Sequence, residues 1–407
     1  MPFPIYGQRP TVLLTNDDGP PSVSSPNIFT FSKALQAAGF DVKVVVPTGQ
    51  MSWVGKAYRI KETITLSYFY PTGPDGLQGE TCDVPRPLKE GETAEWILLS
   101  GTPATCANIG LHHIYQGQID LVISGPNHGR NSSTAFTLSS GTIGATLSAA
   151  LSVPIPGPPG HPSSPSLHET HIPCIAVSYG PILGSAATHH TTPETLALAN
   201  DAAVEACHRL WADWGREPEG GLVQVYSINV PLDEEVLAKD KRRFCWTTIR
   251  RNTYGSLFRT VDFSLPLLPQ RSFVDTFQSL CSAWPTPRLP LTRTLSRAEP
   301  QHHHELSSEQ DAGPGATSEH HPALSDSETR ALTPSHGPRA FRFAPDLTPI
   351  TLAGPDSLPE GTDAWACAKG FVSITPIRAE YAGMREGGCG FASDGDGFIT
   401  PGQFWAA

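Results

Sequence analysis

Two adjacent carboxylates follow the first apolar segment of the chain, in the stretch TVLLTNDDG over residues 11–19. The apolar run predicts a short buried strand, so Asp17 and Asp18 would lie at its carboxyl end. Neighbouring carboxylates repel each other, and burying them without a partner is costly. Mg²⁺ relieves such repulsion and commonly takes one or two carboxylates together with waters and phosphate oxygens. The pair therefore predicts a cation site, and a solvated Asp-Gly turn is the alternative.

A second polar segment is LVISGPNHGRNSSTAFTLSSGTIGA, residues 121–145, which also follows an apolar strand pattern. Asn127 offers a neutral oxygen ligand for a cation. The Ser-Gly-Thr sequence at 140–142 opens a small-residue helix, and the N–H groups at a helix N-terminus bind anions. An ordinary loop with an N-capping Ser or Thr is the alternative for this segment.

A third segment, VPTGQMSWVGKAYRI over residues 46–60, follows the next strand pattern. The hydroxyl of Ser52 can serve as a metal ligand, and the ammonium group of Lys56 can meet a phosphate. Taken alone, this segment is equally compatible with a solvated lysine in a surface loop.

Strand and helix patterns alternate along most of the chain, which predicts an α/β fold of the Rossmann-like, doubly wound type with a mostly parallel sheet. In such sheets ligands bind beyond the carboxyl ends of the strands, where the three polar segments would converge. The predicted strands span residues 11–15, 41–47, 119–125, 172–180 and 221–231, and the predicted helices span 29–39, 104–115, 141–152 and 192–215.

Composition divides the chain into ordered and disordered parts. We predict a main domain over residues 1–283 with a Pro-rich surface insertion at 153–170, and a disordered insertion at 284–339 rich in Pro, Ser, Thr, His and Glu. Residues 340–380 would complete the domain, with an alternating strand pattern at 363–377, and residues 381–407 would form a flexible tail. Substrate specificity is assigned to loops such as 67–95 and 153–170.

The totals restrict the class of protein. The 407 residues are 39% hydrophobic and 16% charged, with 40 Pro and 37 Gly, so part of the chain is expected not to pack. A net charge of -11 argues against binding to duplex nucleic acid. No signal peptide or membrane span is recognised, and the eight scattered cysteines lack a CxxC pair, which favours reduced core thiols. A soluble, cytoplasmic protein is the resulting expectation.

Taken together, the segments resemble the SurE family, the survival-protein phosphatases. The resemblance covers nearly all of the chain predicted to be ordered, and the SWVGKA variant looks like the fungal branch of SurE-like acid phosphatases. The motifs that carry it, in family order, are LLTNDDG, SWVGKA, LSGTPATCAN, DLVISGPNHGRN, SSGTIGA, IPCIAVS, SINVP and TDAWACAKGFVSITPI.

The resemblance implies a metal-dependent enzyme that releases phosphate from nucleoside monophosphates and related esters, and a homodimer formed by exchanged C-terminal elements. Three departures from the bacterial pattern bear on substrate fit. SSPN replaces APG after the aspartates, and Thr105 stands where Asp is common. The loop between Asn127 and Ser140 is one residue longer, so Ser139 competes with Ser140 for the phosphate-binding role. The matching metal ligands are Asp17, Asp18, Ser52 and Asn127, and the matching phosphate-binding residues are Asn131, Ser140, Gly141 and Thr142.

The chemistry expected of these residues is hydrolysis of a phosphate monoester. Asp17 or Asp18 would take a proton from an attacking water, which we favour over an aspartyl-phosphate because the DxD spacing of covalent phosphatases is absent. Oxygen ligands suit Mg²⁺, Mn²⁺ or Ca²⁺. A catalytically silent nucleotide-binding scaffold and a nucleotide-sugar transferase are the competing functions.

Other histidines and acidic residues are weaker candidates. His128 is the one histidine expected to assist the site, because it adjoins Asn127. The DGDGFIT sequence at 394–400 resembles half of a calcium-binding loop, but Ala392 and Gln403 occupy its first and last ligand positions.

Overall fold

A computed structural model describes residues 9–153, 171–182, 191–217, 221–261, 340–346 and 355–380. The predicted insertion at 284–339 and tail at 381–407 lie outside these residues, as does all but the first residue of the predicted insertion at 153–170, so the predicted domain boundaries remain predictions. No helix in the described ranges is long and apolar enough to cross a membrane.

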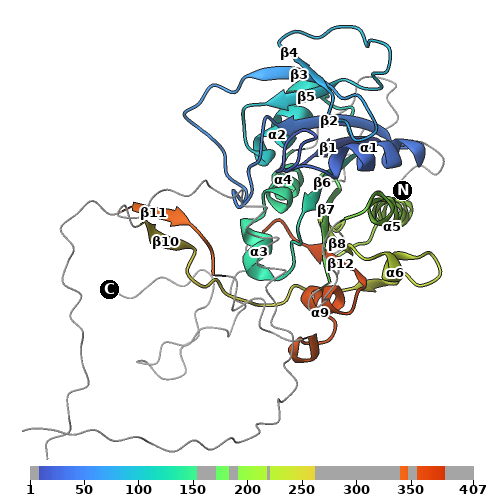
Figure 1. Cartoon of the computed structure of the whole chain (residues 1–407), viewed down its shortest axis with the longest axis vertical. Coiled ribbons are helices and arrows are strands. Elements are labelled where there is room, and N and C mark those ends of the chain that lie inside the picture. Colours follow the sequence, from blue (N-terminus) through green and yellow to red (C-terminus); the bar gives the residue numbers. More distant parts are fainter. Residues whose placement is uncertain are drawn as a thin grey trace, which may run out of the picture.

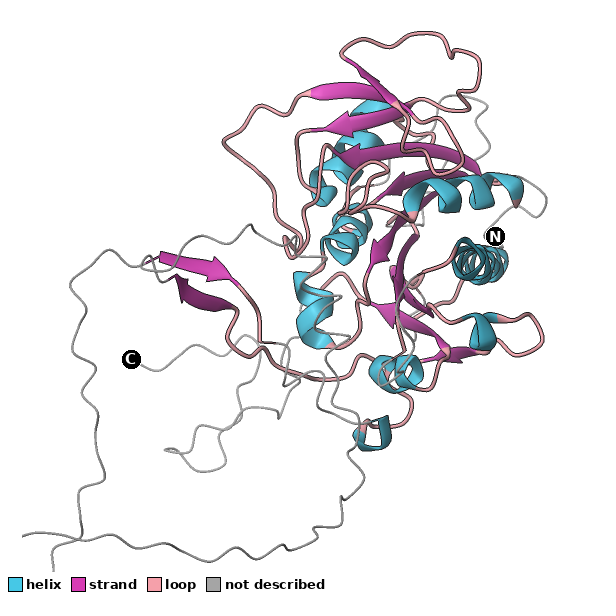
Figure 2. Cartoon of the chain, viewed as in Figure 1, coloured by secondary structure: helices cyan, strands magenta, loops and turns pink. Residues whose placement is uncertain are grey.

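The centre of the fold is a ten-stranded sheet in the order β4-β3-β5-β2-β1-β6-β7-β8-β12-β9 (Figures 1 and 2). The six neighbouring strands β5-β2-β1-β6-β7-β8 pair in parallel, whereas β3 is antiparallel to β5 and β12 is antiparallel to β8. The predicted mostly parallel α/β sheet is confirmed. The strands are β1 (Thr11–Thr15), β2 (Asp41–Pro47), β3 (Leu66–Tyr70), β4 (Glu80–Cys82), β5 (Trp96–Leu99), β6 (Leu121–His128), β7 (Cys174–Gly180), β8 (Val225–Pro231), β9 (Phe244–Trp246) and β12 (Val372–Ile377).

Helices cover both faces of the sheet. Helices α1 (Ile28–Ala37) and α5 (Pro193–Ala212) pack together on one face, and α2 (Pro103–Ile109) packs with α4 (Gly141–Ala150) on the other (Figure 1). Alternating side chains of β1 join the two cores: Val12 and Leu14 pack in one, and Leu13 in the other. The remaining helical segments are α3 (Thr134–Ser139), α6 (Glu234–Leu237), α9 (Asp363–Ala368), the π-helix η1 (Gly110–Ile114) and the 3-10 helix η2 (Pro355–Ser357).

Most predicted elements are present, and most have shorter ends, whereas β6 continues to His128, beyond the predicted end at residue 125. The predicted helix at 29–39 ends at Ala37, and the one at 104–115 is α2 followed by the π-helix η1. The predicted strand at 363–377 is wrong in its first half, where the chain forms helix α9. The hydroxyl of Thr362 accepts a hydrogen bond from the backbone N–H of Trp365, and this N-cap starts a helix in a sequence that alternates like a strand.

A two-stranded antiparallel ribbon stands apart from the central sheet, at the left of Figure 1. It consists of β10 (Phe258–Val261) and β11 (Ala340–Phe343), which pair Phe258 with Phe343. Residues 262–339, which lie outside the described ranges, connect the two strands of this ribbon in the sequence.

Four of the six described cysteines are buried, and all six are free, as expected for reduced thiols; these four are Cys106, Cys174, Cys207 and Cys367.

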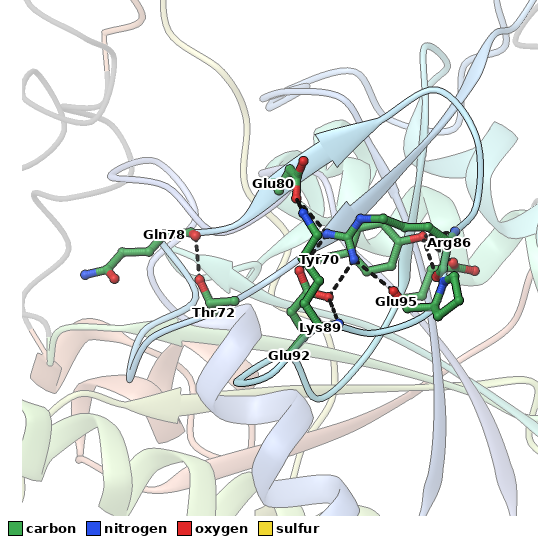
Figure 3. Close-up of polar contacts among 9 residues, drawn as sticks. Tyr70, Thr72, Gln78, Glu80, Arg86, Lys89, Glu92 and Glu95 are labelled. Carbon is green, nitrogen blue, oxygen red and sulfur yellow. Dashed lines mark hydrogen bonds and ion pairs between the residues drawn. The ribbon is translucent and has the colours of Figure 1, made fainter.

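The region 67–95, expected to be a loop, contains most of β3 and all of β4 and is tied together by Arg86. The guanidinium of Arg86 donates to both carboxylate oxygens of Glu92, at 2.7 and 2.6 Å, and to Glu80 at 2.8 Å (Figure 3). It also lies 3.8 Å from the ring centre of Tyr70, whose hydroxyl donates to Glu95. Paired charges and a buried ring thus give this region a fixed conformation.

The Arg86–Glu92 pair predicts a specific acid dependence of stability. Hydrogen bonds from Arg86 lower the pKa of Glu92 from its usual 4.5 to about 2. Because this pKa is depressed in the folded chain, the stabilisation is complete above the unfolded value and is lost as pH falls through about 2. We expect Glu92→Gln to lower the urea midpoint at pH 7. The difference between the wild-type and variant midpoints should become steadily smaller below about pH 4.5. Glu90→Gln, on the same exposed loop, is the control. A difference between the wild-type and Glu92→Gln midpoints that stays constant down to pH 3 would contradict the lowered pKa assigned to Glu92.

Candidate metal and phosphate site

The turn that carries the two aspartates is built by Asn16. Its side-chain oxygen accepts a hydrogen bond from the backbone N–H of Gly19 (3.0 Å), and its amide donates to the carbonyl of Gly19 (2.8 Å). Gly19 has a φ of 84°, and an added Cβ would lie 3.0 Å from the Cα of Gly49. The turn after β1 therefore requires a glycine at this position. Sequence reasoning missed Asn16, although Asn before a turn glycine is a recognisable Asx-turn signal.

Asp17 lies against the N-terminus of α4. Its side chain is buried, and its carboxylate accepts hydrogen bonds from the hydroxyl of Thr142 (2.5 Å) and from the backbone N–H groups of Gly141 and Thr142. A Cβ on Gly141 would lie 2.7 Å from the Cβ of Asp17, so only glycine admits this approach. The predicted Ser-Gly-Thr helix start is present, and in this structure its donors face Asp17. The helix dipole favours the carboxylate there.

Asp18 is equally buried and receives fewer hydrogen bonds. It accepts from the backbone N–H of His128 at 3.0 Å and from the side chain of Gln50. Burial, and then the charge of Asp17, raise the pKa of Asp18 well above its usual value, and burial also raises the pKa of Asp17. No Lys or Arg among the described residues forms an ion pair with either carboxylate. Ionising both carboxyl groups is therefore costly here, and a bound cation would offset that cost.

Asn127, on β6 beside β1, adds an oxygen to this pair. Its side-chain amide donates to the carbonyl of Gly129 at 2.7 Å, which leaves the side-chain oxygen 3.4 Å from the hydroxyl of Thr142. That hydroxyl in turn contacts Asp17, so the structure brings together Asn127, Thr142 and Asp17. The parallel pairing of β1 with β6 places Asp17 and Asn127 at the same edge of the sheet, and the start of α4 brings Thr142 to them.

Ser52 lies in the turn that follows β2 and is partly exposed. The preceding residue, Met51, donates its backbone N–H to the carbonyl of Asp17 at 2.6 Å, and Gln50 contacts Asp18. The turn carrying Ser52 is therefore fastened directly to the aspartate turn. Gln50 is a second contributor that sequence reasoning missed, because nothing in the local pattern distinguishes it from a surface glutamine.

Two further residues predicted to bind phosphate, Ser140 and Asn131, form hydrogen bonds within the protein. Ser140 caps α4, because its hydroxyl accepts from the N–H of Ile143 at 3.1 Å. The hydroxyl of Ser139 instead donates to the carbonyl of Ala135 within α3, so Ser140 is the N-cap of α4. Which of the two serines takes the phosphate-binding role stays a prediction. Asn131 is buried, and its side-chain amide donates to Ser178 on β7 at 2.9 Å.

Lys56 is exposed, and its ammonium group lies 5.3 Å from the ring centre of Tyr58. The hydroxyl of Tyr58 is 2.7 Å from that of Ser148 on α4, so the lysine is held beside this helix. The described contacts do not bring Lys56 to the aspartates, and its role toward phosphate remains a prediction.

The donors fit a hard divalent cation. Carboxylate, hydroxyl and amide oxygens gather at one sheet edge, and among the described residues no cluster of three His, Cys, Asp or Glu side chains offers a softer site. His128 contacts Asp18 through its backbone N–H, and its Nδ1 is a buried atom without a partner among the described residues. Burial lowers the pKa of the imidazole.

The family model for survival protein SurE matches residues 12–256. This chain belongs to the SurE family. Its relatives include 5'-nucleotidase SurE of Caldanaerobacter subterraneus, 31% identical over 143 residues (35% of this chain and 47% of the relative). That of Cytophaga hutchinsonii is 36% identical over 146 residues, 35% of this chain and 46% of the relative.

A eukaryotic relative shares a longer segment with this SurE chain. A probable tubulin–tyrosine ligase of Saccharomyces cerevisiae, PBY1, is 32% identical over 265 residues, which are 61% of this chain and 32% of the yeast protein. The chain thus spans a third to a half of these relatives' lengths. The crystal structure of the SurE protein from Aquifex aeolicus aligns with a TM-score of 0.47 and 18% identity, covering 92% of this chain and 95% of that one.

Proposed function

We propose that this SurE-family chain is a metal-dependent phosphomonoesterase that hydrolyses nucleoside monophosphates or related phosphate esters. The observation that carries the proposal is the pair of buried carboxylates, Asp17 and Asp18, of which Asp17 lies against the N-terminus of α4 and neither forms an ion pair with a Lys or Arg of the described ranges. The 5'-nucleotidase names of the bacterial relatives support the same reaction class.

Four residues would hold the cation, namely Asp17, Asp18, Ser52 and Asn127. A divalent cation bound there, Mg²⁺ or Mn²⁺ with Ca²⁺ as the alternative, supplies Lewis acidity and neutralises developing charge. Hydrolysis also needs an acceptor for the proton of the attacking water. Asp17 is already engaged by the hydroxyl of Thr142 and two N–H groups, so Asp18 is the better-placed acceptor.

The start of α4 would hold the carboxylate of Asp17 and favour an anionic phosphate ester beside it. The hydroxyl of Thr142 and the N–H groups at 141–142 lie at the aspartates, on the side where the helix dipole favours negative charge. Asn131 and Lys56 complete the proposed anion-binding set. A homodimer and a cytoplasmic location stay predictions that accompany this function.

Metal-dependent phosphate release is the test. Chelated protein is assayed on a panel of nucleoside 5'- and 3'-monophosphates and p-nitrophenyl phosphate, with Mg²⁺, Mn²⁺ or Ca²⁺ added back. We expect release only with metal, and a loss on chelation of about 10²-fold or more, since such a cation contributes several kcal/mol to the transition state. No release from any ester by folded, metal-supplied protein would contradict the proposal and favour a silent nucleotide-binding scaffold.

A further inference from the structure

The turn that carries Ser52 contains an unusual backbone. The N–H of Val54 donates to the carbonyl of Met51 at 3.3 Å, which makes residues 51–54 a β-turn with Ser52 and Trp53 in its middle. Trp53, the third residue, has a φ of 65°. Positive φ at this position is the type II arrangement, for which Gly or Asn is preferred. A bulky residue keeps such a conformation only where its surroundings impose it.

Three aromatic rings from the described part of the chain lie around the indole of Trp53. Its ring centre lies 5.8 Å from that of Phe136, 6.0 Å from that of Tyr254 and 5.2 Å from that of Phe343. The Phe136 and Phe343 rings are nearly perpendicular to the indole, an arrangement favourable for aromatic pairs. We refer to Trp53, Phe136, Tyr254 and Phe343 as the aromatic cluster.

The three partner rings come from segments far from Trp53 in the sequence, and hydrogen bonds hold these segments in place. The N–H of Thr134 donates to the carbonyl of Arg250 at 2.9 Å, and the N–H of Ala135 donates to the side chain of Asn252 at 2.7 Å. These bonds fix α3, which carries Phe136, against the segment that carries Tyr254. Phe343 belongs to β11 and packs edge to face against Phe258 of the paired strand β10.

The opposite side of the turn faces the aspartates. Met51 is hydrogen-bonded to the carbonyl of Asp17, and the N–H of Gly55 donates to the carbonyl of Ser139 at 2.9 Å. Ser52 therefore lies between the aspartate turn and a residue whose strained backbone is held by the aromatic cluster. A change in the position of the indole would be transmitted directly to the adjacent Ser52.

We propose that Trp53 is a positioning residue, through which the aromatic cluster holds the hydroxyl of Ser52 in place for cation binding. This inference rests on the proposed function, because it takes Ser52 as a cation ligand. It also assigns a role to the β10–β11 ribbon, which supports the site from outside through Phe343. Supporting residues of this kind typically change metal affinity by about 10- to 100-fold.

Trp53→Gly is the direct test, because glycine adopts the positive φ freely while the ring is removed. Binding of Mn²⁺ to the chelated chain is measured by titration calorimetry, together with the Mn²⁺ dependence of phosphate release. We expect Trp53→Gly to weaken Mn²⁺ binding about 10-fold, with turnover recovering toward the wild-type level at saturating Mn²⁺. Trp53→Phe, which keeps a ring, should restore most of the affinity.

Two substitutions on β11 provide a matched pair. Phe343→Ala removes a member of the cluster and should also weaken Mn²⁺ binding. Phe341→Ala removes a ring that is 63% exposed on the same strand and is outside the described ring contacts of Trp53, and it should leave binding unchanged. Because neither residue adjoins the aspartates, this pair tests the inference even if Trp53→Gly folds poorly.

The outcomes separate this inference from the proposed function. Wild-type Mn²⁺ binding and phosphate release, combined with unchanged affinity in folded Trp53→Gly or in Phe343→Ala, would overturn the positioning role alone. Equal losses in Phe341→Ala and Phe343→Ala would overturn it as well, since the effect would then not pass through Trp53. A wild-type chain that neither binds Mn²⁺ nor releases phosphate would overturn both.

Discussion

Replacing Asp18 with Asn is expected to abolish metal-dependent phosphate release and, at the same time, to stabilise the metal-free chain. Asp18 is proposed both to bind the cation and to accept a proton, so we expect a loss of about 10³-fold or more, equivalent to about 4 kcal/mol. The stability change has the opposite sign because Asp17 and Asp18 are buried side by side. Removing one of two like charges should raise the free energy of unfolding by about 1–3 kcal/mol.

The hydrogen bonds of Asp18 make asparagine a conservative replacement. The side-chain oxygen of an asparagine still accepts from the N–H of His128. The NH₂ group of the asparagine can donate to the side-chain oxygen of Gln50 once the Gln50 amide has rotated by half a turn. The measurements are urea unfolding in chelator, the shift in melting temperature on adding Mn²⁺, and phosphate release. We expect the Mn²⁺-induced shift to disappear in the variant.

Asp41→Asn is the matched control, since Asp41 begins β2, is largely exposed and pairs only with Lys43 among the described ion pairs. An exposed pair of this kind contributes little, so neither activity nor stability should change measurably. If Asp18→Asn retained activity, or were less stable than wild type in chelator, the description of the aspartate pair as a cation site would be wrong.

The parts of the site that were predictable from the sequence are those encoded locally. A short apolar strand followed by Asn-Asp-Asp-Gly places Asp17 and Asp18 at a sheet edge, and Ser-Gly-Thr before small residues marks the start of α4. The parallel register of β1 with β6 then brings Asn127 to the same edge, as the predicted sheet requires. Each of these signals lies within a few residues of the side chain that it positions.

The parts that were not predictable depend on partners far along the chain. The sequence predicts a loop where β3 and β4 lie, because the Arg86 contacts that fix these strands are side-chain interactions without a local pattern. Helix α3 begins after Ser133, which has a φ of 69° and is held by Asp363. The Trp53 turn likewise depends on Phe343, which no local window of the sequence contains.

Asp363 is the residue for which this long-range dependence predicts the largest loss of stability. It is buried, and one carboxylate oxygen accepts from the N–H of Ser133 at 2.6 Å. The other oxygen accepts from the N–H groups of Arg250 (3.0 Å) and Ala364 (2.7 Å). One side chain thus joins the loop before α3, the segment after β9 and the C-terminal helix α9.

Asp363→Ala would leave these backbone donors without an acceptor in a buried position. Each orphaned donor costs about 1–3 kcal/mol, so the free energy of unfolding should fall by about 3 kcal/mol or more. The left-handed backbone of Ser133 would also lose the contact that holds it, which would release Asn131 and the start of α3. We therefore expect a loss of phosphate release in addition to the loss of stability.

Asp356→Ala in the same C-terminal segment separates this effect from a general sensitivity of the region. Asp356 has a side chain that is 96% exposed and lies 3.4 Å from the ammonium group of Lys369. Its removal should change the free energy of unfolding by less than about 0.5 kcal/mol. Urea unfolding of both variants decides the matter. Similar small changes in the two would mean that Asp363 does not join the three segments, and that Ser133 keeps its conformation through other contacts.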